Sequence, residues 1–457
     1  SFTQLSKALI FELSEKFEQI IARGLELGLE AVEIYASTSE SNTIKVDEGN
    51  LESYNVKKLF GVSIRGLLNG KMGYVYTETL DDDTMEILLQ QLLENVKLIS
   101  STEEEFMYAS GATYQEVPNL ESDYKNYSTA EKVAMLQDLE KKTLAVSPKI
   151  VKVGYCQYSE TSQKVQIMNS KGLDLSRSYS YTTTIVGPLA AEGDQTAMGF
   201  AGDINPFFQQ IEKDRIIKEA TEAALAQLGA GFVKTGKYPV VFKRDVATEL
   251  LSAFSSVFTG EAALKKMTIL ADKVGEKIFG DNITIMDDPF YDDALVKSSF
   301  DDEGVPCKTK AVVEKGVFNG LLHSLKTAHY FHVAPTGNGF KMSTAGSIST
   351  EPTNLFIKEG NLSKDEIIST VEEGIYITEV NGLHAGLNPI SGDFNVQSSG
   401  YMIKNGKIDK PITLFVTSGN FFEMMKNIEA IGNDIEKRFV GVASPTLKVK
   451  SLAISGK

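Results

Sequence analysis

Cysteine, histidine and long apolar runs are scarce in this 457-residue sequence, and tryptophan is absent. The two cysteines, Cys156 and Cys307, lie far apart, and a secreted disulfide framework would need more of them, so a reducing compartment is indicated. No segment reaches the ~20 uninterrupted apolar residues of a membrane helix. The N-terminal helix-like pattern, interrupted by Glu12 and Glu15, does not resemble a signal peptide. We therefore predict a cytoplasmic protein that has no membrane contact.

Clusters of basic residues are also scarce. The formal net charge is −15, and the densest basic pairs are Lys57-Lys58 and Lys265-Lys266. Binding to a phosphate backbone depends on clustered lysine and arginine, so the sequence argues against direct contact with nucleic acid. An acidic surface favours solubility and a basic partner surface.

Several signatures of hydrolases are missing. None of the four histidines is followed by glutamate, so the HExxH arrangement of zinc peptidases is absent. The Gly-x-Ser-x-Gly nucleophile elbow does not occur either. His329 and His332 are three residues apart and would share one face of a helix, which leaves open a site formed with His323 and nearby carboxylates. The acidic run at residues 301–303 lacks the spacing of a calcium loop and is interpreted as a solvated loop.

The residues that are present indicate a large globular protein. Apolar residues make up 42% and charged residues 23%, which is typical of globular chains, and the length suggests two domains. Apolar spacing predicts helices and short strand-like runs in the first half, and mainly strands and turns after residue 283. We predict an α+β domain at residues 1–230, with a possible sub-boundary near 101–127, and a β-rich domain at residues 231–457.

Local signals predict where several elements begin and turn. Asn-Gly pairs at residues 69–70, 319–320 and 405–406 are typical of two-residue hairpin turns. Ser128 with Glu131, and Ser363 with Glu366, fit capping boxes at the start of helices. A helix is also expected from about residue 206 to 228.

The densest unusual stretch lies at residues 384–395 and reads HAGLNPISGDFN. It places turn-forming residues and hydrogen-bonding side chains between two strand-like runs. His384, Asn388 and Asp393 could present polar groups to a bound peptide backbone, and the same composition would serve a purely structural turn. The residues alone leave both interpretations open.

This loop resembles the G-x-N-P-x-S/T-G-D-F segment of the PmbA (TldE) branch of the TldD/PmbA family. The resemblance continues through residues 400–407, 418–420, 431–434 and 444–446, and appears upstream at residues 46–52, 300–306, 316–321, 336–340 and 352–355. It spans nearly the whole chain. It implies a two-domain α+β fold, a role in cytoplasmic proteolysis and peptide maturation, and an old description as a modulator of DNA gyrase.

The resemblance also implies what this chain lacks. In the TldD branch, zinc is held by a helix that reads H-E-x-x-x-H and by a later cysteine. The corresponding helix is expected here at residues 245–258, which contain no histidine, and no cysteine follows Cys307. We therefore expect a non-catalytic subunit that holds no cofactor itself and joins a TldD-like partner containing the zinc.

The expected ligand of such a complex is an unfolded peptide, held by strand addition. The candidates for lining or shaping its site are His384, Asn388 and Asp393. Asn420, Asn433 and Asp434 are weaker candidates, for which a structural role is the alternative. The isolated chain could form a homodimer. The alternatives are a stand-alone hydrolase that uses His323, His329 or His332, and a scaffold protein that binds a client such as gyrase.

Overall fold

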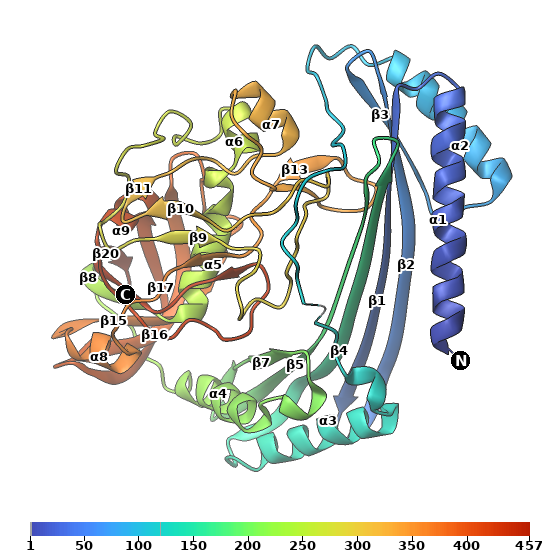
Figure 1. Cartoon of the computed structure of the whole chain (residues 1–457). Coiled ribbons are helices and arrows are strands. Elements are labelled where there is room, and N and C mark those ends of the chain that lie inside the picture. The colour runs from blue at the N-terminus through green and yellow to red at the C-terminus, as the bar shows by residue number, and fades with distance from the viewer. Residues whose placement is uncertain (1, 119) are drawn as a thin grey trace.

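Two bodies lie side by side in the computed structural model, which describes residues 2–118 and 120–457, with side chains described from residue 13 onward. One is a long sheet with helices on its outer face, and the other is a compact β-rich body (Figure 1). This mixture of helices and strands confirms the predicted α+β class.

Seven antiparallel strands form the long sheet. Their order is β3-β2-β1-β4-β5-β6, and β7 also pairs with β5. The strands are β1 Ala31–Asp47, β2 Asn50–Leu68, β3 Lys71–Thr77, β4 Ile150–Asn169, β5 Asp174–Glu192, β6 Gln195–Met198 and β7 Ala201–Asn205. The short runs expected early in the sequence are continuous in the structure, because the serine and threonine residues between them pair on both sides within the sheet.

Two pairs of helices cover the outer face of the long sheet (Figure 1). They are α1 Phe2–Glu26 with α2 Asp82–Lys97, and α3 Thr129–Leu144 with α4 Lys213–Ala226. Residues of even number in β1 face these helices: Ile34 packs in the core of α1 and α2, and Ile44 in the core of α3. Residues of odd number, such as Tyr35, face the C-terminal body, where Tyr35 packs in one cluster with Phe300.

The C-terminal body contains three sheets. The six-stranded sheet has the order β17-β16-β15-β8-β20-β18, and a further pairing of β17 with β20 closes five of its strands into a ring. Its strands are β8 Gly236–Phe242, β15 Glu373–Asn381, β16 Asp393–Lys404, β17 Lys407–Asn420, β18 Ile428–Ile431 and β20 Leu447–Ser455. The other sheets comprise β9 Ile285–Asp287, β10 Lys310–Glu314, β11 Val317–Phe318, β14 Leu355–Ile357 and β19 Val442–Ala443, and the pair β12 Gly339–Lys341 with β13 Ile348–Thr350.

Short helices complete the C-terminal body. They are α5 Arg244–Phe254, α6 Gly260–Leu264, α7 Leu325–Tyr330, α8 Lys364–Ser369 and α9 Phe421–Lys426, with a 3-10 turn at Ser255–Phe258. The 3-10 turns at Tyr124–Asn126 and Phe208–Gln210 precede α3 and α4 of the first body. The core of this body is aromatic: the ring of Phe254 lies 4.6 Å from that of Phe421 and 6.3 Å from that of Phe394. Burial of such large rings removes much apolar surface from water and stabilises this half of the fold together with the aliphatic residues of the same core.

Most of the local predictions are confirmed. Asn69-Gly70 joins β2 to β3 and Asn405-Gly406 joins β16 to β17, with positive φ at all four residues as the turn requires. Ser128 forms the complete capping box of α3 with Glu131, and Ser363 caps α8 by accepting from the backbone N–H of Glu366.

Two local predictions are wrong. The hairpin between β10 and β11 turns at Lys315-Gly316, where both residues have positive φ, and not at Asn319-Gly320. A Cβ at Gly316 would lie 2.5 Å from the carbonyl oxygen of Phe279, so only glycine fits there. The helix expected from residue 206 begins at Lys213, since the Asp203 carboxylate accepts from the backbone N–H of Glu212 and holds the preceding segment out of the helix.

The segment at residues 101–127 joins α2 to α3 and contacts the C-terminal body, and its described residues form no strand or α-helix. Lys326 pairs with Glu103 at 2.6 Å, and the Tyr114 hydroxyl donates to the carbonyl oxygen of Gly304 at 2.6 Å. The predicted main boundary at residue 230 falls between α4 and β8, and it stays a prediction.

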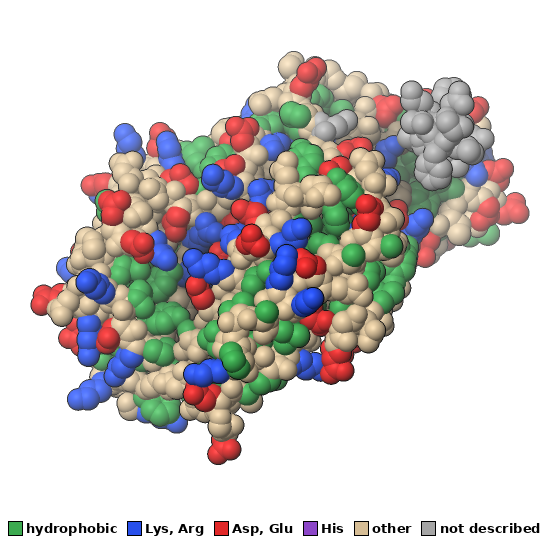
Figure 2. Space-filling view, turned by 90° about the horizontal axis from the view of Figure 1, so that it is seen from below, with side chains coloured by type: hydrophobic (Ala, Val, Ile, Leu, Met, Phe, Trp, Pro, Cys, Tyr) green, Lys and Arg blue, Asp and Glu red, His purple; other side chains and the backbone are tan. Residues whose placement is uncertain are grey.

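Charged side chains of both signs are interspersed over the face seen from below (Figure 2). None of the helices in the described part of the chain is long and apolar enough to cross a membrane.

Candidate functional site

Helix α5 occupies the position where the resemblance predicts a zinc-binding helix, directly after β8. Its buried face consists of Val246, Ala247, Leu250, Leu251 and Phe254. Its polar face carries Asp245 and Glu249, and the pKa of Glu249 is raised by partial loss of hydration and by the nearby carboxylates of Asp245 and Glu379. Within the described residues, no group of three histidine, cysteine or acidic side chains could hold a metal ion. The residues of α5 therefore do not fit zinc.

The histidines of the alternative hydrolase site have separate surroundings. His323 is buried, its Nδ1 lies 3.0 Å from the Thr327 hydroxyl, and burial lowers its pKa to about 4. His329 packs against Phe106 with ring centroids 4.5 Å apart. His332 is exposed just after α7. A neutral, buried His323 beside threonine does not resemble a general base oriented by a carboxylate.

Three of the predicted site residues meet at the loop between β15 and β16. Asn388 lies in the loop, Asp393 begins β16, and Asn420 ends β17. The side-chain oxygen of Asn388 accepts from the backbone N–H groups of Ile390 and Ser391. Asn420 donates to the Asp393 carboxylate at 3.0 Å and to the Ser391 carbonyl oxygen at 2.7 Å. These bonds close the turn at residues 388–393 and fasten it to the start of α9, which Asn420 caps.

Two positions of this loop favour glycine, because a side chain there would clash with a neighbouring group or strain the backbone. A Cβ at Gly386 would lie 1.9 Å from the carbonyl oxygen of Asn395, and Gly392 has φ of 86° and packs against Phe422. The loop is thus a rigid turn, whose exposed side chains include His384, Asn388 and Asp393. An open hollow of about 310 Å³ lies beside it, lined by Lys237, Ser418, Gly419, Asn420, Glu423, Met424, Asn427, Ser451, Leu452 and Ala453.

The remaining two candidates lie at the end of β18, apart from this loop in the chain. Asp434 accepts from the backbone N–H and the hydroxyl of Thr446 at 2.8 and 2.7 Å, and its carbonyl oxygen accepts from Arg244. Asn433 is exposed, and its backbone N–H donates to Leu362. Both residues have contacts that would serve to position the backbone.

The acidic run Asp301-Asp302-Glu303 is buried, so its interpretation as a solvated loop is wrong. It lies where the long sheet meets the C-terminal body. Asp301 accepts from the backbone N–H groups of Glu303, Val305 and Gly339, and Asp302 pairs with Arg177 of β5. Repeated hydrogen bonding of this kind allows carboxylates to remain in the protein interior.

A second buried ion pair, formed by Arg65 and Glu33, lies beside the pair formed by Arg177 and Asp302. Arg65 of β2 donates to Glu33 of β1 at 2.7 Å and lies 3.9 Å from Glu303. Lys341 donates to the Ser63 hydroxyl and lies 4.8 Å above the ring of Tyr35, and burial together with the charge of Arg65 lowers its pKa to about 8. Charged side chains of both bodies thus form one interdomain cluster, comprising Glu33, Arg65, Arg177, Asp301, Asp302, Glu303 and Lys341.

The sequence carried an indirect signal for this cluster. Residues 300–306 belong to the stretches that resemble the family and include the three acids of the cluster, and Gly339 of the stretch 336–340 donates its backbone N–H to Asp301. Charged residues in a sequence are interpreted as exposed by default, and only the tertiary contacts reveal their burial.

The interdomain cluster predicts a pH dependence of stability. Burial raises the pKa of Glu303 to about 7 from its usual 4.5, so the folded protein binds this proton more tightly than the unfolded chain does. The contribution of Glu303 to the free energy of unfolding should therefore rise as the pH falls from 8 toward 5. The lowered pKa of His323 acts in the opposite direction below about pH 6.5. In the variant Glu303→Gln this rise should be smaller, as measured by urea unfolding at pH 8 and pH 5.5.

Glu94→Gln, at an exposed position of α2, serves as the matched control and should keep the full pH dependence. An unchanged pH dependence in Glu303→Gln would contradict the assignment. The pKa of Asp301 is also raised by burial and by Glu303, so part of the effect should remain in the variant.

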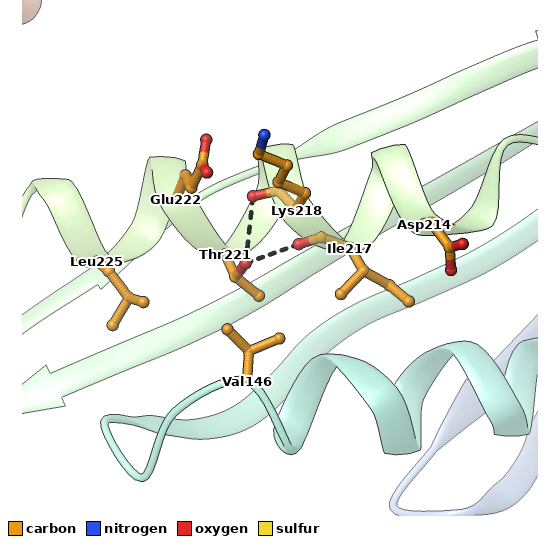
Figure 3. Close-up of a pocket in the computed structure, with 7 residues that line it drawn as sticks. All are labelled: Val146, Asp214, Ile217, Lys218, Thr221, Glu222 and Leu225. Atoms are coloured by element: carbon orange, nitrogen blue, oxygen red, sulfur yellow. Dashed lines mark hydrogen bonds between the residues drawn. The ribbon is translucent and has the colours of Figure 1, made fainter.

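A separate hollow of about 310 Å³ lies between the end of α3 and helix α4. Val146, Ile217 and Leu225 point toward its interior, while Lys218 and Glu222 point away from it (Figure 3). The Thr221 hydroxyl donates to the carbonyl oxygen of Ile217 at 2.7 Å. None of the predicted site residues lines this hollow.

Comparison with known proteins supports the resemblance. Residues 235–456 match the PmbA/TldA metallopeptidase C-terminal domain, residues 122–228 the central domain and residues 32–96 domain 1 of the same family. A metalloprotease of Methanothermobacter thermautotrophicus is 25% identical, and the match covers 97% of this chain and 100% of the relative.

Two solved structures have the same fold. A proposed modulator of a DNA gyrase from Thermotoga maritima has a TM-score of 0.89 at 28% identity, with 97% of this chain and 100% of that chain covered. TldE from Thermococcus kodakarensis has a TM-score of 0.86 at 22% identity, with 96% and 100% covered. Because the three matched domains together span most of its length, the chain belongs to the PmbA/TldD metallopeptidase family.

Proposed function

We propose that this chain is a non-catalytic, PmbA/TldE-like subunit that joins a TldD-like zinc metallopeptidase in cytoplasmic proteolysis and peptide maturation. The observation that carries the proposal is the composition of α5. A zinc-activated water needs imidazole, thiolate or carboxylate ligands held around one ion. This helix has no imidazole or thiolate, and its two carboxylates, Asp245 and Glu249, belong to no group of three possible ligands within the described residues. Hydrolytic chemistry then comes from the partner.

The part of the subunit assigned to peptide binding is the rigid loop between β15 and β16. His384, Asn388 and Asp393 are exposed on it, and the bonds of Asn388 and Asn420 hold the turn in one conformation. A preorganised polar loop costs less entropy on binding than a mobile one. Asn433 and Asp434 lie after β18 and position the backbone there through bonds to Leu362 and Thr446.

The test is reconstitution with a TldD-like chain. Cleavage of an unfolded peptide should require both chains, and elemental analysis should find zinc in the partner and none in this chain alone. In the reconstituted complex, His384→Ala should raise KM roughly tenfold, which corresponds to about 1.4 kcal/mol of binding.

His332→Ala, at an exposed histidine after α7, is the matched control and should leave KM unchanged. Full activity of the partner without this chain would contradict the subunit role. Stoichiometric zinc in this chain, lost on His329→Ala, would instead support the hydrolase that uses His323, His329 or His332. Capture of gyrase in the absence of a peptidase would support the scaffold.

A further inference from the structure

A small cavity lies where the segment at residues 101–127, the long sheet and the C-terminal body meet. Its volume is about 80 Å³, and it is lined by Val117, Pro118 and Leu120 of the segment, by residues 176–179 of β5, and by residues 295 and 297–299 of the C-terminal body. Pockets that enclose a whole small molecule usually exceed about 300 Å³. This one, called the junction cavity below, has room for one small group.

The first cation of the junction cavity is Arg177. A guanidinium has five N–H donors, and Arg177 gives three hydrogen bonds to groups within residues 298–302. Among the described residues its other donors have no partner, so they remain for a ligand. Four serines, at residues 176, 178, 298 and 299, complete the polar part of the lining.

The second cation is Lys297. Its Nζ donates to the carbonyl oxygens of Asp292 and Ala294 at 3.2 and 2.8 Å, which occupies two of the three donors of an ammonium group. None of the described carboxylates forms an ion pair with this nitrogen. Burial lowers the pKa of Lys297, and the more distant carboxylates of Asp288, Asp292 and Asp293 oppose this effect. An anion in direct contact would therefore stabilise the charged lysine.

The charges of the lining select the kind of anion. Asp302 balances Arg177, so Lys297 leaves an excess of one positive charge. In the described part of the chain, no acidic residue lines the cavity. One excess charge complements a carboxylate, whereas a doubly charged phosphate would remain partly unneutralised.

We propose that the junction cavity binds the C-terminal carboxylate of a peptide. The carboxylate accepts from Lys297 and Arg177, through charge-assisted bonds that are short and strong. The last side chain of the peptide packs on the apolar part of the lining, which comprises Val117, Pro118, Leu120 and Leu295. Capture of a terminal carboxylate is a recurring mode of peptide recognition.

The source of the carboxylate is a peptide because the chain belongs to a peptidase family. A free organic acid would offer the same charge without the backbone amide groups that the serines of the cavity can bond. The site lies apart from the loop between β15 and β16, and its occupation needs no partner chain. The inference therefore goes beyond the proposed function, and binding to the isolated chain tests it separately.

Titration calorimetry of the isolated chain tests the ligand. The peptide acetyl-Gly-Gly-Val should bind about tenfold more tightly than its C-terminal amide, which lacks the charge that both cations recognise. The acid 3-methylbutanoate has the carboxylate and the branched apolar group but no peptide bond, and it should bind more weakly than the peptide. No binding of the peptide, equal binding of its amide, or tighter binding of 3-methylbutanoate or inorganic phosphate would overturn the proposal.

Substitution of Lys297 tests the site. Lys297→Met removes the charge and keeps most of the side-chain length, so it should weaken binding of acetyl-Gly-Gly-Val about tenfold. Lys218→Met, at the lysine of the hollow between α3 and α4, is the matched control and should leave the affinity unchanged. Equal affinities of these two variants would overturn the site.

A second pair of variants does not depend on Lys297. Leu120→Glu and Leu120→Gln introduce polar side chains of the same size into the lining, and only the glutamate repels a carboxylate. Leu120→Glu should therefore bind acetyl-Gly-Gly-Val more weakly than Leu120→Gln does, with the fold of both checked by circular dichroism. Equal binding by the two folded variants would contradict the assignment of the carboxylate to this cavity.

Discussion

Replacing Arg177 by alanine should lower the free energy of unfolding by about 3–5 kcal/mol, the range for removing one member of a buried ion pair. Arg177 donates to the carbonyl oxygen of Phe300 at 2.9 Å and pairs with Asp302. Its guanidinium also lies 4.8 Å from the centre of the Phe300 ring. The variant would leave the Asp302 carboxylate buried without its cation at the junction of the two bodies. Urea unfolding followed by circular dichroism measures the loss.

Lys142→Ala is the control for this prediction. Lys142 pairs with Asp138 at 2.8 Å one turn away on α3, and both side chains are largely exposed. Exposed pairs of this kind contribute about 0.5 kcal/mol. A loss below about 1 kcal/mol for Arg177→Ala would show that the ion pair contributes little to the docking of the bodies.

Replacing Phe254 by alanine should have an effect of similar size, about 3–5 kcal/mol. Phe254 is the last residue of α5 and is fully buried. Its ring is stacked on Phe421 and meets the edge of Phe394, at the start of α9 and in β16. The cavity left by the missing ring would thus lie between α5 and β16, the strand that follows the loop at residues 384–392. Thermal and urea unfolding both measure the loss.

Phe200→Ala is the matched control, because this ring is 58% exposed. Less apolar surface is buried there, and the expected loss is about 1 kcal/mol or less. Equal losses in the two variants would contradict the assignment of Phe254 to the centre of the C-terminal core.

Features set by neighbouring residues were predictable from the sequence. Asn69-Gly70 and Asn405-Gly406 form turns because both residues of such a turn need positive φ. Ser128 with Glu131 caps α3 because the two side chains reach the first free backbone N–H groups of their own helix. No distant contact is needed for either, so short patterns were sufficient.

Features set by distant contacts were not predictable in this way. Glycine is required at residue 316 because the carbonyl oxygen of Phe279 approaches it closely, and the late start of α4 depends on the carboxylate of Asp203. Asn388 and Asp393 could be recognised as turn formers, but the bond from Asn420 that fastens their turn crosses 27 residues of chain. Their roles in binding stay predictions.

The sequence by itself determined the chemical inventory of this protein: a chain with four histidines, none followed by glutamate, and with no histidine in the helix after residue 242. Tertiary structure alone decided which charges are buried and which strand is left open. Asp302 and Glu303 lie in the interior because Arg177, Arg65 and backbone N–H groups from distant segments surround them. β3 pairs with the outer side of β2 only from Val62 to Leu68, because β3 is shorter than its neighbour. Residue types follow from the sequence directly, whereas solvation depends on which segments the fold brings together.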